Sequence, residues 1–108
     1  MKGKDLETLP SRAKMFKVHR KTVNAVQLKW KFEDKNVYNK ENEYIIEVEV
    51  ENGVWHEAFR TKEEYCMIKE LSPDTVYKFQ ICAENSKGRG PAYKIKVKTK
   101  IVANQWHG

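Results

Sequence analysis

Apolar and polar residues alternate along most of this chain, a period that places every second side chain on one face of a β-strand. In the clearest run, Tyr44, Ile46, Val48 and Val50 alternate mainly with glutamates, which is typical of a strand with one buried face. No segment shows the 3.6-residue apolar spacing of an amphipathic helix. The pattern predicts seven short strands, near residues 14–19, 26–30, 44–50, 55–60, 66–68, 77–84 and 93–98.

Turn-forming residues separate most of these strands. Asn52–Gly53 stands between the third and the fourth, and both residues tolerate the positive φ of a tight hairpin. Many short strands with turn signals between them predict an all-β fold, an antiparallel sandwich of two sheets. With 108 residues the chain has the size of one domain. We expect that domain at residues 10–100, with linkers at 1–9 and 101–108.

The most specific motif is the stretch LSPDTVYKFQICAENSKGRG, residues 71–90. Its leucine, proline, threonine and tyrosine, followed by alternating apolar residues, alanine, asparagine and paired glycines, resemble the pattern of fibronectin type III domains. Trp30 and Tyr44 add to the resemblance, which covers about residues 10–100. It implies a seven-stranded immunoglobulin-like β-sandwich. The chain departs from the family by lacking a proline within residues 31–42 and by having only Pro10 before the first strand.

Four residues are expected to form the structural core around this motif: Trp30, Tyr44, Leu71 and Tyr77. Pro73 fixes φ in the turn before Tyr77. The ring of Tyr77 then enters the core, and its hydroxyl finds a partner on the backbone of that turn. This arrangement is the tyrosine corner of sandwich folds.

The chain is basic, with a net charge of +6, which favours acidic partners if the lysines cluster. Lys94, Lys96 and Lys98 recur at every second position of the last strand and therefore share one face. One interpretation is a charge mosaic, in which the glutamates of the third strand moderate this row. The other is a surface that binds polyanions such as heparin, nucleic acid or anionic lipid. Nucleic acid is disfavoured because no aromatic residue interrupts the row.

The loop at residues 85–91 is a second candidate for contact with a partner. It carries Lys87 and Arg89 beside glycines that a tight reversal requires. The resemblance places it at the end of the sandwich where some family members carry an Arg-Gly-Asp motif. Here Arg89–Gly90 is followed by Pro91, so the acidic residue is missing. With the loop at residues 32–42, it forms the expected contact surface at that end.

Catalysis finds no support in the sequence. No serine lies in a nucleophile elbow, and the three histidines show no ligand spacing to the cysteines, so we expect no enzyme, no metal site and no cofactor. Cys66 and Cys82 fall on strands of opposite sheets, which predicts free thiols.

The sequence therefore predicts a non-catalytic module for protein interaction or spacing, cut from a larger protein, with polyanion binding as the alternative. Its partner is a protein that the sequence does not identify, and we expect the isolated domain to be a monomer. The first ten residues lack the apolar segment of a signal peptide, and the chain has no glycosylation sequon. With unpaired cysteines, these features favour a reducing compartment.

Overall fold

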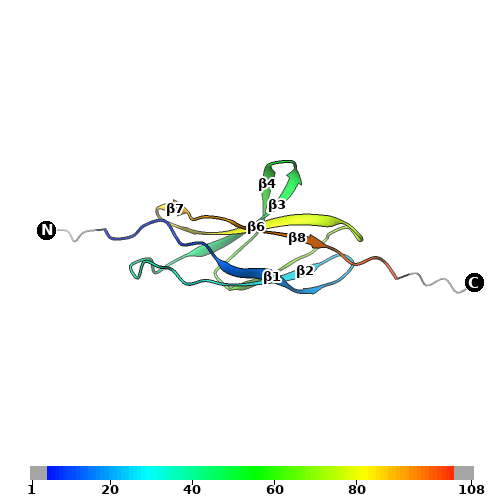
Figure 1. The fold of residues 1–108 in the computed structure, drawn as a ribbon, viewed down its shortest axis with the longest axis horizontal. Coiled ribbons are helices and arrows are strands. Elements are labelled where there is room, and N and C mark those ends of the chain that lie inside the picture. Colours follow the sequence, from blue (N-terminus) through cyan, green and yellow to red (C-terminus); the bar gives the residue numbers. More distant parts are fainter. Residues whose placement is uncertain (1–4, 104–108) are drawn as a thin grey trace, which may run out of the picture.

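The computed structural model describes residues 5–103, which form strands, turns and loops and no helix. None of these residues thus supplies an apolar helix long enough to cross a membrane. Two sheets pack face to face, which confirms the predicted all-β sandwich (Figure 1). The strands are β1 (Lys14–Lys21), β2 (Val26–Lys31), β3 (Glu43–Glu51), β4 (Val54–Thr61), β5 (Tyr65–Ile68), β6 (Val76–Asn85), β7 (Gly88–Arg89) and β8 (Tyr93–Lys98).

All strand pairs are antiparallel. The smaller sheet has the order β1-β2-β5, and the larger has the order β4-β3-β6 with β7 and β8 both paired to β6. The strands other than β7 correspond to the seven that the sequence predicts. β7 is only two residues long, too short to produce an alternating pattern.

The core lies between the sheets and is built from the inward residues of both. Trp30 and Phe79 are its largest buried side chains. Trp30 has edge-to-face contacts with Phe16 and Tyr44, at ring-centroid distances of 6.0 and 5.6 Å. Leu71 is half-buried and packs against this cluster.

Tyr77 is half-buried at the edge of the core and stacks on Phe79, with ring centroids 6.1 Å apart. The backbone N–H of Ser72 donates a hydrogen bond to the Tyr77 hydroxyl at 2.7 Å. This is the contact between ring and preceding turn that the sequence predicts.

We expect Tyr77→Phe to lower the free energy of unfolding by about 1 kcal/mol, because it removes one hydrogen bond and leaves the ring in place. Urea denaturation measures the change. Tyr65→Phe is the matched control, since Tyr65 is 53% exposed and should lose nothing measurable. Equal losses in both variants would contradict a structural role for the Tyr77 hydroxyl.

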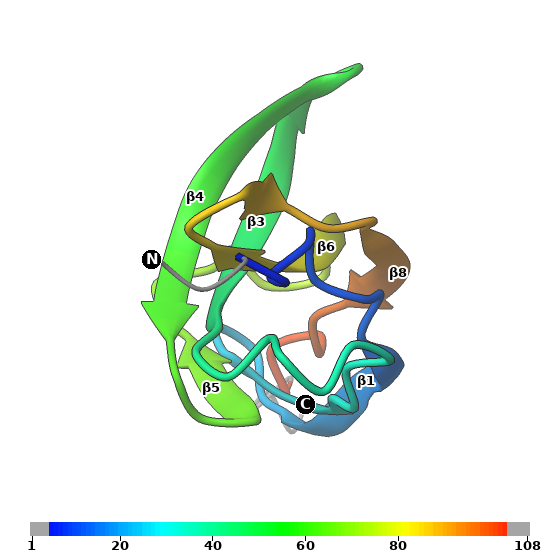
Figure 2. The same ribbon diagram turned by 90° about the vertical axis from the view of Figure 1, so that its left-hand side faces the viewer.

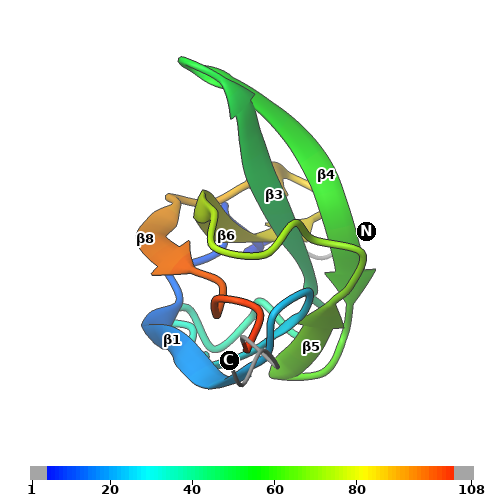
Figure 3. The same ribbon diagram turned by 90° about the vertical axis from the view of Figure 1, so that its right-hand side faces the viewer.

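The β3–β4 hairpin extends well beyond the rest of its sheet (Figures 2 and 3). Its turn contains Gly53 at a φ of 80°, as the Asn52–Gly53 pair indicates. The register of the hairpin shifts between Ile46 and Glu47 and again near its tip. The hairpin therefore carries side chains of β4 past the edge of the sandwich.

Candidate partner-binding surface

The row of lysines on β8 lies on the outer face of the larger sheet. Lys94, Lys96 and Lys98 are all exposed there, as the alternation predicts. Lys98 forms an ion pair with Asp74 at 3.1 Å. Among residues 5–103, Lys94 and Lys96 form no ion pair with an acidic side chain.

The glutamates of β3 face the same side, with β6 between them and β8. The Lys78 ammonium lies 3.4 Å from the Glu49 carboxylate. The N–H of Gly53 also donates to Glu49, and these two contacts hold its pKa below the ordinary value. This face is therefore a mosaic of opposite charges with Lys94 and Lys96 left over.

Trp55 adds an aromatic ring to this row, which the sequence interpretation missed. The residue lies on β4, opposite Glu49 in the register of the hairpin. Its ring centroid is 5.7 Å from the Lys94 ammonium, a distance that allows a cation–π contact. A groove of about 340 Å³ runs here, lined by Glu49, Trp55, Lys78, Lys94, Ile95 and Lys96. The register of the hairpin was the only signal that could have placed Trp55 here.

Arg89 is engaged inside this sheet. Its guanidinium contacts Glu84 at 3.1 Å and Glu47 at 3.3 Å. Arg60 contacts Glu84 from the other side at 2.9 Å. The hydrogen bonds from Arg60 and Arg89 lower the pKa of Glu84. Under this cluster lie Ile45 and Cys82, which are buried although they belong to the outward phase of their strands.

Lys87 is engaged as well, by the segment that precedes the first strand. Its ammonium pairs with the Asp5 carboxylate, and this bond raises the pKa of Lys87. The side-chain amide of Asn85 donates to Thr8 O at 2.7 Å. One end of the sandwich is thus tied to residues 5–11 through the loop at 85–91.

The loop at residues 32–42 holds the same segment from the other side. Asn39 is 8% exposed; its Oδ1 accepts from the Thr8 N–H at 2.9 Å, and its Nδ2 donates to Leu9 O and Asp34. Asn36 donates to Leu6 O at 2.9 Å. The two loops that the sequence offers as a contact surface are therefore bridged by the chain's own residues.

Position 90 requires glycine because the backbone of Pro10 lies very close to it. A Cβ at this position would lie 2.2 Å from Pro10 O. Its φ is not in the positive range, whereas Gly88 has a φ of 129°. In this reversal, only Gly88 therefore needs the positive φ that glycine allows.

Both thiols are buried and unpaired. Burial raises the pKa of Cys66 to about 12 and raises that of Cys82 as well. Such thiols are poor nucleophiles near neutral pH, because the thiolate is the reactive form. Within residues 5–103, no three side chains of metal-binding type gather into a cluster.

The family model described as Fibronectin type III domain matches residues 11–100. No curated protein sequence matches the chain significantly. A solution structure of the fibronectin type III domain of human fibronectin type III domain containing protein 3 is 20% identical, with a TM-score of 0.79, and the match covers 98% of this chain and 100% of that one.

Two larger structures are also similar. The twitchin kinase region from C. elegans is 24% identical with a TM-score of 0.75, covering 87% of this chain and 17% of that one. Chitinase ChiA74 from Bacillus thuringiensis is 30% identical with a TM-score of 0.72, covering 93% and 15%. The chain thus resembles a small part of each of these two proteins.

Proposed function

Because the chain belongs to the fibronectin type III family, we propose that it is a non-catalytic interaction or spacer module of a larger multidomain protein. Domains of this family serve in general as modules for interaction or spacing in such proteins. The main support for this proposal is where the two ends of the described chain lie in space. The described chain begins at one end of the long axis of the sandwich and finishes at the other (Figure 1). A domain of this shape separates whatever precedes it from whatever follows it.

The chemistry of the polar groups also supports a non-catalytic role. Glu84 is held between two arginines, and its lowered pKa keeps it charged and unable to donate a proton near neutral pH. The two cysteines are buried thiols. These groups stabilise the sheet in which they lie.

A panel of chromogenic esters, phosphate esters, glycosides and peptides tests this function. We expect no turnover above the buffer rate with any of them. A turnover that a single substitution abolishes would make the chain an enzyme and remove the proposal.

Polyanion binding is the second candidate function, and the groove beside Trp55 favours it. An aromatic ring next to the unpaired ammonium groups of Lys94 and Lys96 can contact a sugar or base while the lysines neutralise anions. The affinity for heparin should fall steeply with rising salt, and K94E/K96E should flatten that slope. Undetectable or salt-independent binding to heparin, RNA and anionic vesicles would exclude it.

A further inference from the structure

The outer face of the smaller sheet has lysines that no glutamate row balances. Lys17 of β1 lies directly opposite Lys29 of β2, and Lys14, which forms an ion pair with Glu33 at 3.5 Å, lies opposite Lys31. In the rows across β1, β2 and β5, no position is occupied by a carboxylate; the partners of Lys29 and Gln27 on β5 are Tyr65 and Met67. Like charges opposite each other destabilise a sheet. We call Lys17, Lys29 and Lys31 the cationic face, beside which His19 lies.

His19 lies beside these lysines on the same face of the sheet. Its pKa lies below the ordinary value chiefly because of the charge on Lys29; desolvation and then the charges of Arg20 and Lys17 add to the effect. On the opposite sheet, Lys78 and Arg89 are met by glutamates, which leaves over the two lysines Lys94 and Lys96. The cationic face is therefore the surface of the sandwich where an anionic partner would neutralise most unbalanced charge.

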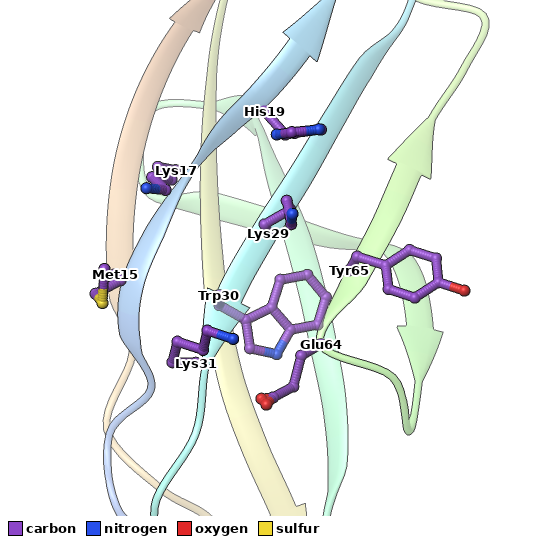
Figure 4. A pocket seen from close by; sticks show the side chains of 8 residues that line it. All are labelled: Met15, Lys17, His19, Lys29, Trp30, Lys31, Glu64 and Tyr65. Carbon is purple, nitrogen blue, oxygen red and sulfur yellow. The ribbon is translucent and has the colours of Figure 1, made fainter.

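A groove of about 320 Å³ opens on this face, lined by Met15, Lys17, His19, Lys29, Trp30, Lys31, Glu64 and Tyr65 (Figure 4). Its walls include two exposed apolar side chains, Met15 at 56% and Tyr65 at 53%. Met15 has a φ of 55°, at the irregularity where β1 changes register against β2. This conformation is strained for a residue other than glycine, and strain of this kind concentrates at functional sites.

Two residues that line the groove each have a buried polar atom without a hydrogen-bond partner. These atoms are the indole Nε1 of Trp30, which can only donate, and Oε2 of Glu64, which accepts. Trp30 as a whole is only 2% exposed. Figure 4 shows the nitrogen of its ring on the side of Lys31 and Glu64. Both atoms are covered by the protein, so a ligand on the outer face of the sheet does not reach them, and the groove itself is formed by the exposed side chains around them.

We propose that this groove binds an extended acidic peptide segment of a partner protein, with its carboxylates on Lys17, Lys29 and Lys31. This inference rests on the interaction function proposed above and names its partner class. An apolar side chain of the peptide lies against Met15 and Tyr65.

A peptide fits this groove better than the other common polyanions. A peptide can alternate acidic with apolar residues, so it supplies carboxylates to the lysines and an apolar side chain to Met15 and Tyr65. The exposed methionine would gain little from a sugar. An extended segment of about eight residues spans roughly 26 Å, which is enough to follow the lysines along β2.

The test is fluorescence anisotropy with a labelled peptide of about eight residues that contains glutamates and one leucine. The wild-type domain should bind it at physiological salt. K17E/K29E should weaken binding about tenfold or more, and K62E/K69E, which changes the net charge equally at two exposed lysines outside the groove, should leave it unchanged. Met15→Gly should also weaken binding while relieving backbone strain, so lost affinity is not a folding defect.

Four results would overturn the inference: no binding of the peptide, equal binding after the leucine is replaced by serine, equal loss in the two charge-reversal variants, or binding of heparin through Lys17 and Lys29 in place of the peptide. Each of these leaves the interaction or spacer function standing, because that function fails only when turnover is found. Circular dichroism of each variant confirms that the sandwich is intact.

Discussion

Replacing Trp30 with alanine is expected to lower the free energy of unfolding by about 3–5 kcal/mol. The side chain is 2% exposed and contacts Phe16 and Tyr44 edge-to-face. Its removal leaves a cavity between the sheets that these rings, fixed on β1 and β3, cannot close. A small domain has about 5–15 kcal/mol of stability in all. The variant should therefore be largely unfolded at urea concentrations well below the midpoint of the wild-type transition. Urea denaturation followed by far-ultraviolet circular dichroism measures the loss.

Trp55→Ala provides the matched control, because it removes the same side chain from the outer groove. Trp55 is half-exposed and contacts Lys94 outside the core. We expect this variant to lose about 1 kcal/mol or less, since a surface cation–π contact contributes about that much. A loss as large as that of Trp30→Ala would mean that the sandwich does not depend on its interior tryptophan.

The strands could be predicted because alternation within a strand and turn residues between strands are both local features of the sequence. In β3 and β6 the inward phase is apolar at almost every position, and the burial of Ile46, Phe79 and Ile81 follows from it. The tyrosine corner is also local, since Ser72 and Tyr77 are five residues apart. Local patterns need no knowledge of how the sheets pack.

The outward phase was harder to interpret. Ile45 and Cys82 stand opposite each other on β3 and β6 and are buried on the outer face. They are covered because Arg60 and Arg89 reach over them from β4 and β7, which no alternation reveals. The one sequence feature that indicated this burial was the presence of apolar residues among the outward, mainly polar positions of the two strands.

The cationic face could not be predicted, because it depends on register. Lys17 meets Lys29 only because β1 shifts against β2 between Lys14 and Lys17. The sequence shows lysines on both strands but not which of them are opposed. Trp55 was missed for the same reason, since the shifts within the β3–β4 hairpin decide where it lies.

The segment at residues 5–11 is the other feature outside the reach of sequence patterns. Thr8 bonds Asn39 across 31 positions, and Asn85 bonds Thr8 across 77. Each contact pairs polar residues of irregular loops, which have no period. The end of the sandwich therefore looks open in the sequence and is bridged in the structure.

Gly90→Ala is expected to release this segment and to lower the free energy of unfolding by about 1–3 kcal/mol. The new Cβ would lie 2.2 Å from Pro10 O and 2.9 Å from Pro10 C, and backbone atoms cannot rotate away as a side chain would. Residues 10 and 11 must then move as a unit. Thr8, whose N–H is bonded to Asn39, lies only two residues before Pro10. Its N–H should therefore exchange with solvent much faster than in the wild type.

Gly53→Ala separates this effect from the general cost of replacing a glycine. Gly53 has a φ of 80° and no atom within 4 Å of the position of a Cβ, so alanine there causes backbone strain of about 1 kcal/mol and no clash. That variant should leave the exchange of the Thr8 N–H unchanged. If Gly90→Ala also leaves it unchanged, Pro10 does not rest on Gly90, and the bridge between the two loops must be held by the asparagines alone.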